Sequence, residues 1–256
     1  MLKVRAEQMQ AFERSAWRAF EDEMIAHSKD FAPTLCTVIG DAQVRLAVRH
    51  MIARAGTYNL TLRGPIRLCV ELMFLCGSAF DTDPQYPGFG DCLRSSNSEM
   101  RRADQLQAAH NEYLEAVAGP DNINIHNAER AIADYARRPT VVSEPQLEAE
   151  LIGEMTRSFP QRTAYIGEAA LRELVTEGRQ EARKHRFTTP RGQALVVILM
   201  SAFGHGCTSD PLYPWISQTL TDPMIVDAAA RADRLERKSL TWLEHVLARL
   251  PQVGLA

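Results

Sequence analysis

The feature that most constrains this chain is an internal duplication. Ile66–Pro87 reads IRLCVELMFLCGSAFDTDPQYP, and residues 193–214, shifted by 127 positions (66 to 193), read QALVVILMSAFGHGCTSDPLYP. An ungapped alignment of residues 40–93 with residues 167–220 contains about 16 identities in roughly 54 positions. The repeat unit covers residues 16–118 and 143–247, which is too long for a solenoid module of about 20 to 50 residues. The sequence therefore predicts two fused copies of one helical unit.

The apolar residues of both copies recur with helical spacing. Residues 5–30 carry Met9, Phe12, Trp17 and Phe20 three to five positions apart, which places them on one face of a helix. No stretch of useful length alternates with period two. We therefore expect an all-α fold of two tandem repeats in a pseudo-twofold arrangement, with the two apolar helices near the shared interface.

Breaks in the helical pattern divide the chain. Gly119-Pro120 ends the first copy, and the stretch from Arg138-Pro139 to Glu144-Pro145 resembles a linker. The predicted organisation is a first repeat over residues 1–120, a connector over 121–145 with a short helix from about 127 to 137, and a second repeat over 146–256.

Each copy couples its apolar segment to a turn that reads Asp-Pro-x-Tyr-Pro. A glycine, Gly77 or Gly204, precedes each turn and is expected to end the apolar helix. Asp83 is expected to cap a helix that begins at the following proline, and Asp210 to do the same in the second copy. The shared residues of the two copies are thus mostly those that helix ends require.

Composition restricts the class of function. The chain has 45% hydrophobic residues, 24% charged residues and a formal net charge of -3 over 256 residues, so it shows no basic footprint for nucleic acid or for an anionic membrane. Its longest apolar runs are shorter than the roughly 20 residues that cross a bilayer. The start has no continuous apolar region typical of a secretory signal, so we expect a cytoplasmic protein. Five cysteines without CxxC spacing favour reduced, packed thiols.

No motif assigns a catalytic or metal site. The acidic stretch Phe80–Asp83 lacks the further oxygen donors of a calcium loop, and His205-Gly206-Cys207 supplies two soft ligands where zinc takes three or four. We therefore expect no metal and no cofactor. One alternative remains open: an enzyme whose site lies between the two repeats and uses His205, Cys207 and acids such as Asp81.

Binding to a protein is the other hypothesis. The two tyrosine-bearing turns are expected to be surface loops, and tyrosine is common at interfaces. Arg183-Lys184-His185-Arg186 is the densest basic run, and it is either a solvated helix end or a patch for an acidic partner. The predicted partner-binding residues are Phe80, Asp81, Asp83, Tyr86, Arg183, Arg186, Asp210, Tyr213 and Trp215.

The first copy also carries a set of motifs spread over three predicted helices and one turn. They are Glu7-Gln8-Met9 with Phe12, Arg54-Ala55-x-x-Tyr58, Leu72-Met73-Phe74 with Gly77, and Phe80-Asp81-x-Asp83-Pro84 with Pro87. This set resembles a family of small helical bacterial proteins associated with type VI secretion toxin gene clusters. Members of that family carry Trp after the last proline, where this chain has Gly88 in the first copy and Trp215 in the second.

The resemblance implies a non-enzymatic accessory protein. Its partner would be a secreted toxin, and its role that of a chaperone, an adaptor or an immunity protein. A self-associating structural protein is a third hypothesis, and a homodimer remains open.

Overall fold

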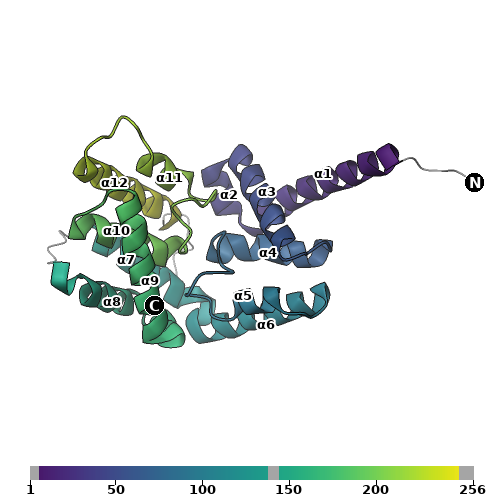
Figure 1. Cartoon of the computed structure of the whole chain (residues 1–256). Helices are drawn as coiled ribbons and strands as arrows, with labels where there is room; N and C mark the ends of the chain where they lie inside the picture. Colours follow the sequence, from purple (N-terminus) through teal and green to yellow (C-terminus); the bar gives the residue numbers. More distant parts are fainter. Residues whose placement is uncertain (1–5, 138–143, 248–256) are drawn as a thin grey trace, which may run out of the picture.

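The computed structural model of the chain describes residues 6–137 and 144–247. These residues form twelve α-helices and two single-turn 3₁₀ helices, Pro120–Asn122 and Glu144–Gln146, with no strand among them (Figure 1). The all-α prediction is confirmed. None of the described helices combines the length and the apolar character that crossing a membrane requires.

Six helices form the N-terminal half. They are α1 (Ala6–Phe31), α2 (Pro33–Ile39), α3 (Asp41–Thr57), α4 (Arg63–Cys76), α5 (Phe89–Arg94) and α6 (Glu99–Val117). The apolar helix α4 packs against α1, α3 and α6. Neighbours on several sides explain why α4 is apolar nearly all round.

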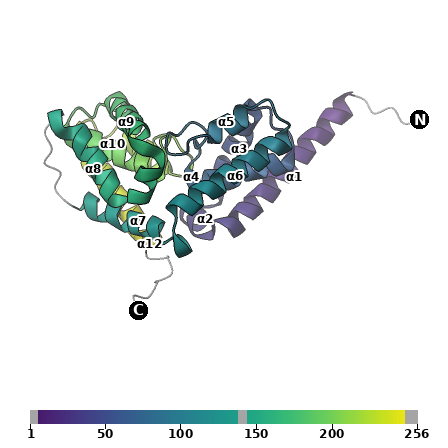
Figure 2. The ribbon, with the colours of Figure 1, turned by 90° about the horizontal axis from the view of Figure 1, so that it is seen from below.

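Six helices form the C-terminal half. They are α7 (Ile123–Ala136), α8 (Leu147–Ser158), α9 (Pro160–Lys184), α10 (Pro190–Phe203), α11 (Pro214–Leu220) and α12 (Ala228–Leu247). The second apolar helix, α10, packs against α7, α8, α9 and α12. The two halves lie side by side, and α6 contacts α9 between them (Figure 2).

Several helix boundaries repeat with the 127-residue shift of the sequence. Helix α4 begins at 63 and ends at 76, and α10 begins at 190 and ends at 203. Gly40 lies between α2 and α3 with φ of 82°, and Gly167 kinks α9 with φ of 78°. The start of α1 has no such match. Helix α8, which corresponds to the end of α1, begins at Leu147, and this position is equivalent to residue 20 (147 − 127 = 20). The unmatched part of α1 projects from the body of the molecule (Figure 1).

One predicted boundary was wrong in detail. The helix predicted at about 127 to 137 begins at Ile123, and it packs against α8, α10 and α12 with Ala128 and Ala133 buried. Pro33 opens the short helix α2, which the apolar periodicity had not indicated. Pro190 opens α10 in the same way, whereas Pro65 is the third residue of α4. Residues 138–143 of the predicted linker lie outside the described residues.

Candidate functional site

The two halves meet where their apolar helices end. Gly77 follows α4 with φ of 89° and ψ of 160°, and Gly204 follows α10 with φ of 90° and ψ of 151°. A Cβ atom on Gly77 would lie 2.8 Å from the carbonyl oxygen of Phe203, and one on Gly204 would lie 2.9 Å from that of Cys76. Only glycine allows both this backbone conformation and this approach, so the glycines that end the helices also form the junction.

Two aspartates join the halves across this junction. The backbone N–H of His205 donates to Oδ2 of Asp83 at 2.7 Å, and the backbone N–H of Ser78 donates to Oδ2 of Asp210 at 2.7 Å. The same contact is therefore made in both directions. Burial raises the pKa of both carboxyl groups, and the donated hydrogen bonds oppose that rise.

The sequence predicted that these two aspartates cap helices, and that prediction was wrong. Oδ1 of Asp83 accepts from the backbone N–H of Gln85, and Oδ1 of Asp210 accepts from that of Leu212, two residues further on in each case. This local bond closes a turn, and the next helices begin only later, at Phe89 and Pro214. Each side chain thus uses one oxygen for its own turn and the other for the opposite half.

Most of the predicted partner-binding residues lie inside the molecule. Six of them have exposed fractions of 7% or less: Phe80, Asp81, Asp83, Tyr86, Asp210 and Tyr213. The prediction that both turns form a recognition surface was wrong for these side chains, because the turns fold inward against the junction. Trp215 is partly buried, with its ring 6.1 Å from that of Phe203, while Arg183 and Arg186 are exposed.

The residues of the predicted enzymatic alternative have other roles. Cys207 is completely buried, and burial raises the pKa of its thiol well above the usual value. Asp81 forms an ion pair with Arg54 at 2.7 Å, and Nδ1 of His205 lies 3.0 Å from Glu177. None of the three lines the cavity described below. Across the described ranges, no group of three or more His, Cys, Asp or Glu side chains could hold a metal ion.

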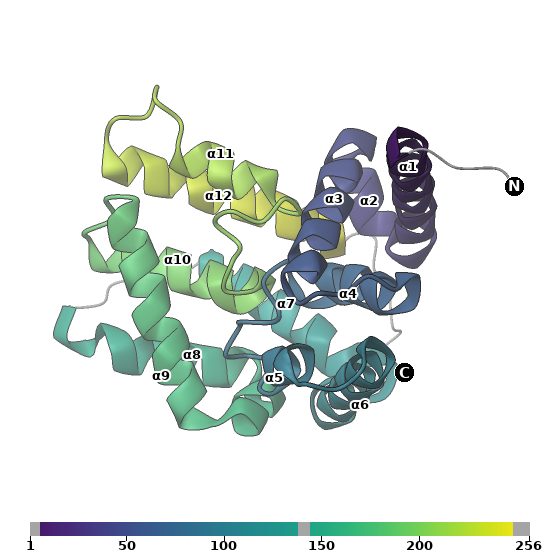
Figure 3. The same ribbon diagram turned by 45° about the vertical axis from the view of Figure 1, so that its right-hand side comes forward.

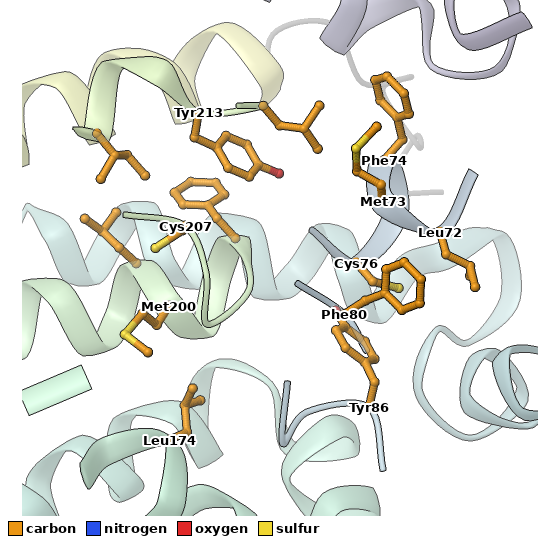
Figure 4. Packing of buried hydrophobic residues seen from close by; sticks show 14 of the residues in the cluster. Leu72, Met73, Phe74, Cys76, Phe80, Tyr86, Leu174, Met200, Cys207 and Tyr213 are labelled. Carbon is orange, nitrogen blue, oxygen red and sulfur yellow. The ribbon is translucent and has the colours of Figure 1, made fainter. Parts of the chain in front are cut away.

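A cavity of about 470 Å³ lies between the halves. Its walls come from both sides of the junction and from α7. In Figure 4, Tyr213 lies opposite Phe74 and Cys76. The central lining residues are Cys76, Tyr86 and Tyr113 of the N-terminal half, Phe203, Tyr213 and Trp242 of the C-terminal half, and Ile125, Glu129 and Ile132 of α7. We call this space the interface cavity.

Two groups of aromatic side chains, one from each half, line the interface cavity, and we call them together its aromatic wall. The ring centroids of Tyr86 and Tyr113 are 5.1 Å apart, and those of Phe203 lie 4.7 Å from Tyr213 and 4.8 Å from Trp242. Burial raises the pKa of Tyr113 to about 12, so its phenol stays protonated at neutral pH. The wall is apolar, with hydroxyl and indole groups at intervals.

One guanidinium group, that of Arg162, lines the cavity beside these aromatic side chains. Arg162 of α9 is only 8% exposed, its guanidinium carbon lies 4.4 Å from the ring centroid of Phe159, and its Nη2 donates to Oγ of Ser201 at 3.3 Å. It forms no ion pair with any carboxylate of the described residues. His110 also lines the cavity, and burial lowers the pKa of its imidazole, which favours the neutral form.

Helix α7 supplies the acidic side of the cavity. Burial raises the pKa of Glu129, and Nδ1 of His126 lies 3.5 Å from its carboxylate. A mostly apolar cavity with a few polar groups at a domain interface is the usual form of a small-molecule site. We therefore take the interface cavity as the candidate functional site.

Sequence reasoning did not find this cavity. The signal that was available is the tyrosine repeated at positions 86 and 213, together with Arg162 at the position where the first copy has Leu35 (35 + 127 = 162). Neither signal locates a cavity without the packing of α7. In comparisons with known proteins, the chain matched no family model, no curated protein and no solved structure.

Proposed function

We propose that this chain is a non-catalytic binding protein made of two fused copies of one helical unit, related by a pseudo-twofold axis. The reciprocal contacts support this arrangement: Gly77 approaches Gly204, and Asp83 and Asp210 each accept a hydrogen bond from the opposite half. An axis through this junction would exchange the two sets of contacts.

The non-catalytic part of the proposal rests on where the reactive groups lie. The thiol of Cys207 is buried with a raised pKa, and the carboxylate of Asp81 is held by Arg54. A catalytic thiol needs a lowered pKa and access to substrate. These side chains stabilise contacts between helices instead.

An exposed apolar surface in the C-terminal half supports the proposal that the partner is a protein. Met224 and Val226 are 86% and 85% exposed in the loop formed by residues 221–227, which joins α11 to α12 (Figure 3). Arg231 ties this loop to the end of α9, because its guanidinium donates to the carbonyl oxygens of Ile225 and His185 at 2.5 and 3.3 Å. We call the loop and the end of α9 together the α9–loop surface.

The basic run predicted from the sequence belongs to this surface. Arg183 and Arg186 are exposed, and within the described ranges neither forms an ion pair. An apolar centre with arginines beside it suits an acidic protein partner, because charge complementarity raises the association rate and apolar burial adds affinity. The resemblance to proteins of type VI secretion toxin clusters supports a secreted toxin as that partner, bound in the cytoplasm by a chaperone, adaptor or immunity protein.

The decisive experiment is co-expression with the toxins encoded by neighbouring genes, followed by pull-down and measurement of affinity. We expect Arg183→Glu with Arg186→Glu to weaken the complex by about tenfold or more, because reversed charges repel an acidic partner. Met224→Ser with Val226→Ser should weaken it through lost apolar contact.

The matched control lies in the other half. Met100 and Arg101 are also exposed, at the start of α6, so Met100→Ser with Arg101→Glu makes the same kinds of change on a different surface. This control should leave the affinity unchanged. Absence of a complex with every neighbouring toxin, or equal losses in both variants and the control, would contradict the proposal. Light scattering on the isolated protein tests the self-association hypothesis at the same time.

A further inference from the structure

We propose that the interface cavity binds an organic monoanion, a carboxylic acid whose carboxylate pairs with Arg162 and whose apolar body lies against the aromatic wall. This is a small-molecule site, separate from the α9–loop surface and independent of the proposed protein partner.

Arg162 is the observation that points to an anion. A guanidinium remains charged in proteins, and a buried charge is costly unless it is paired with an opposite charge. Its close partners are the hydroxyl groups of Ser201 and Tyr113 and the ring of Phe159, and all three are neutral. A planar guanidinium that lacks a carboxylate is suited to accept one from a ligand, through two parallel hydrogen bonds.

The fold itself does not require arginine at this position. Leu35 occupies the equivalent position of the N-terminal half and also lines the interface cavity. The same helical unit is therefore built with an apolar residue there. The charge of Arg162 is an addition to the C-terminal half, and no carboxylate of the described residues forms an ion pair with it.

One donor in the cavity wall lacks a partner. The indole N–H of Trp242 is buried and has no hydrogen-bond partner in the described part of the chain. Tryptophan N–H groups usually find an acceptor when they are buried. An indole N–H without an acceptor and a guanidinium without a carboxylate, both in the lining of one cavity, favour a ligand with acceptor oxygens.

The size and lining of the cavity define the rest of the ligand. A volume of about 470 Å³ falls within the range of roughly 300 to 1,000 Å³ that is typical of small-molecule sites. The aromatic wall favours an alkyl chain or an aromatic ring as the body. Arg162 is the only Arg or Lys among the described residues that line the cavity, so we infer a single acidic group.

The cavity is open to solvent, which a ligand needs for entry. Leu75 is 53% exposed and Asn122 is exposed, and both line the cavity. A ligand can therefore enter the cavity from solvent at these residues.

The test uses the full chain and direct calorimetric titration with decanoate, with decanol as the uncharged analogue of the same length. We expect decanoate to bind at least about tenfold more tightly than decanol, because only the acid pairs with the guanidinium. Arg162→Leu, which installs the residue of the N-terminal half, should remove this preference and leave weak binding of decanol. Equal binding of decanoate by this variant and by the parent would overturn the proposal, as would no binding of decanoate by the parent.

A second variant covers the case in which Arg162→Leu does not fold. Ala202 lines the cavity at the position equivalent to Leu75, so Ala202→Leu narrows the cavity with a side chain that the other half already carries there. This variant should weaken the binding of decanoate more than the binding of hexanoate, because the longer chain needs more of the cavity. It should still bind decanoate more tightly than decanol. If both acids still bind as they do to the parent, they bind outside the cavity, and the proposal is wrong. Neither result depends on a toxin partner, so the two proposals fail separately.

Discussion

Asp81 and Thr208 occupy equivalent positions of the two halves, four residues after the junction glycine, yet their partners differ in charge. Asp81 accepts a hydrogen bond from Nε of Arg54 at 2.7 Å, and it also accepts one from the hydroxyl of Tyr58. Thr208 instead donates to Glu181 at 2.9 Å. Because 54 + 127 = 181 and 81 + 127 = 208, the acid of this contact is on the turn in the N-terminal half and on the helix in the C-terminal half.

A third residue contacts the acid in each half, and we call the three residues of each half a cluster. His185 lies 3.2 Å from Glu181, at the position that Tyr58 occupies in the first half (58 + 127 = 185). The two halves thus use different residues for the same contact, and each arrangement ties the turn to its helix, so we call this a compensated exchange. The difference between Leu35 and Arg162 has no such compensation. Uncompensated differences are the better guide to function, because stability does not explain them.

Some positions have kept both identity and role. Arg102 donates to the carbonyl oxygen of Tyr58, and Arg231 donates to that of His185. Each arginine donates a hydrogen bond to a backbone carbonyl at the C-terminal end of a helix, which is α3 in the N-terminal half and α9 in the C-terminal half. Arg102 and Arg231 each begin an Arg-Ala-Asp sequence, and from this point the equivalent positions of the two halves are 129 residues apart instead of 127. The arginine of this shared sequence therefore has a structural explanation.

The strongest test of the equivalence of the halves is at the junction. We expect Gly77→Ala and Gly204→Ala each to lower the free energy of unfolding by about 4 kcal/mol or more, because a Cβ atom there adds a backbone clash to a conformation that only glycine adopts readily. Urea denaturation monitored by circular dichroism measures the loss. Unequal losses would show that the two glycines do not have equivalent roles.

Gly40→Ala is the matched control for this experiment. Gly40 has the same backbone conformation, with φ of 82° and ψ of 160°, but a Cβ atom would meet nothing within 4 Å. The loss should be about 1 to 3 kcal/mol, from backbone strain alone. A loss as large as that of Gly77→Ala would mean that the junction contact contributes little.

A smaller effect is expected from the exchanged charges. Asp81→Thr should lower the free energy of unfolding by about 2 kcal/mol, because Arg54 and Tyr58 lose their acceptor. Adding Arg54→Glu to this variant installs the acid and hydroxyl of the C-terminal half and should restore part of the loss. The double-mutant cycle is read from urea denaturation curves, and strictly additive losses would refute the idea of compensation.

The smallest expected effect concerns acid sensitivity. Burial lowers the pKa of His110 below its unfolded value, so the folded state binds fewer protons and loses stability as the pH falls through the unfolded pKa. His110→Phe should therefore lose less stability than the parent between about pH 7 and about pH 5. The C-terminal half has Ser239 at the equivalent position (110 + 129 = 239), which does not titrate in this range. Parallel pH profiles of the thermal midpoint for parent and variant would contradict this expectation.

The sequence by itself determined much of the local structure. Helical periodicity and the glycines at 77 and 204 predicted an all-α chain and the ends of both apolar helices, because these signals depend on residues within one or two turns. The helix α2 was missed because a proline can open a helix as well as end one. The caps predicted at Asp83 and Asp210 failed because the free oxygen of each carboxylate is directed to the opposite half.

Only the tertiary structure decided which side chains are accessible and where they meet. The sequence placed Tyr86 and Tyr213 in surface loops, but the close approach of the two glycines turns both loops inward and buries them. The interface cavity exists because α7, which has no counterpart in the first half, closes a space between unlike walls. No local pattern contains that information, since the position of Arg162 opposite an aromatic wall depends on contacts between residues far apart in the chain.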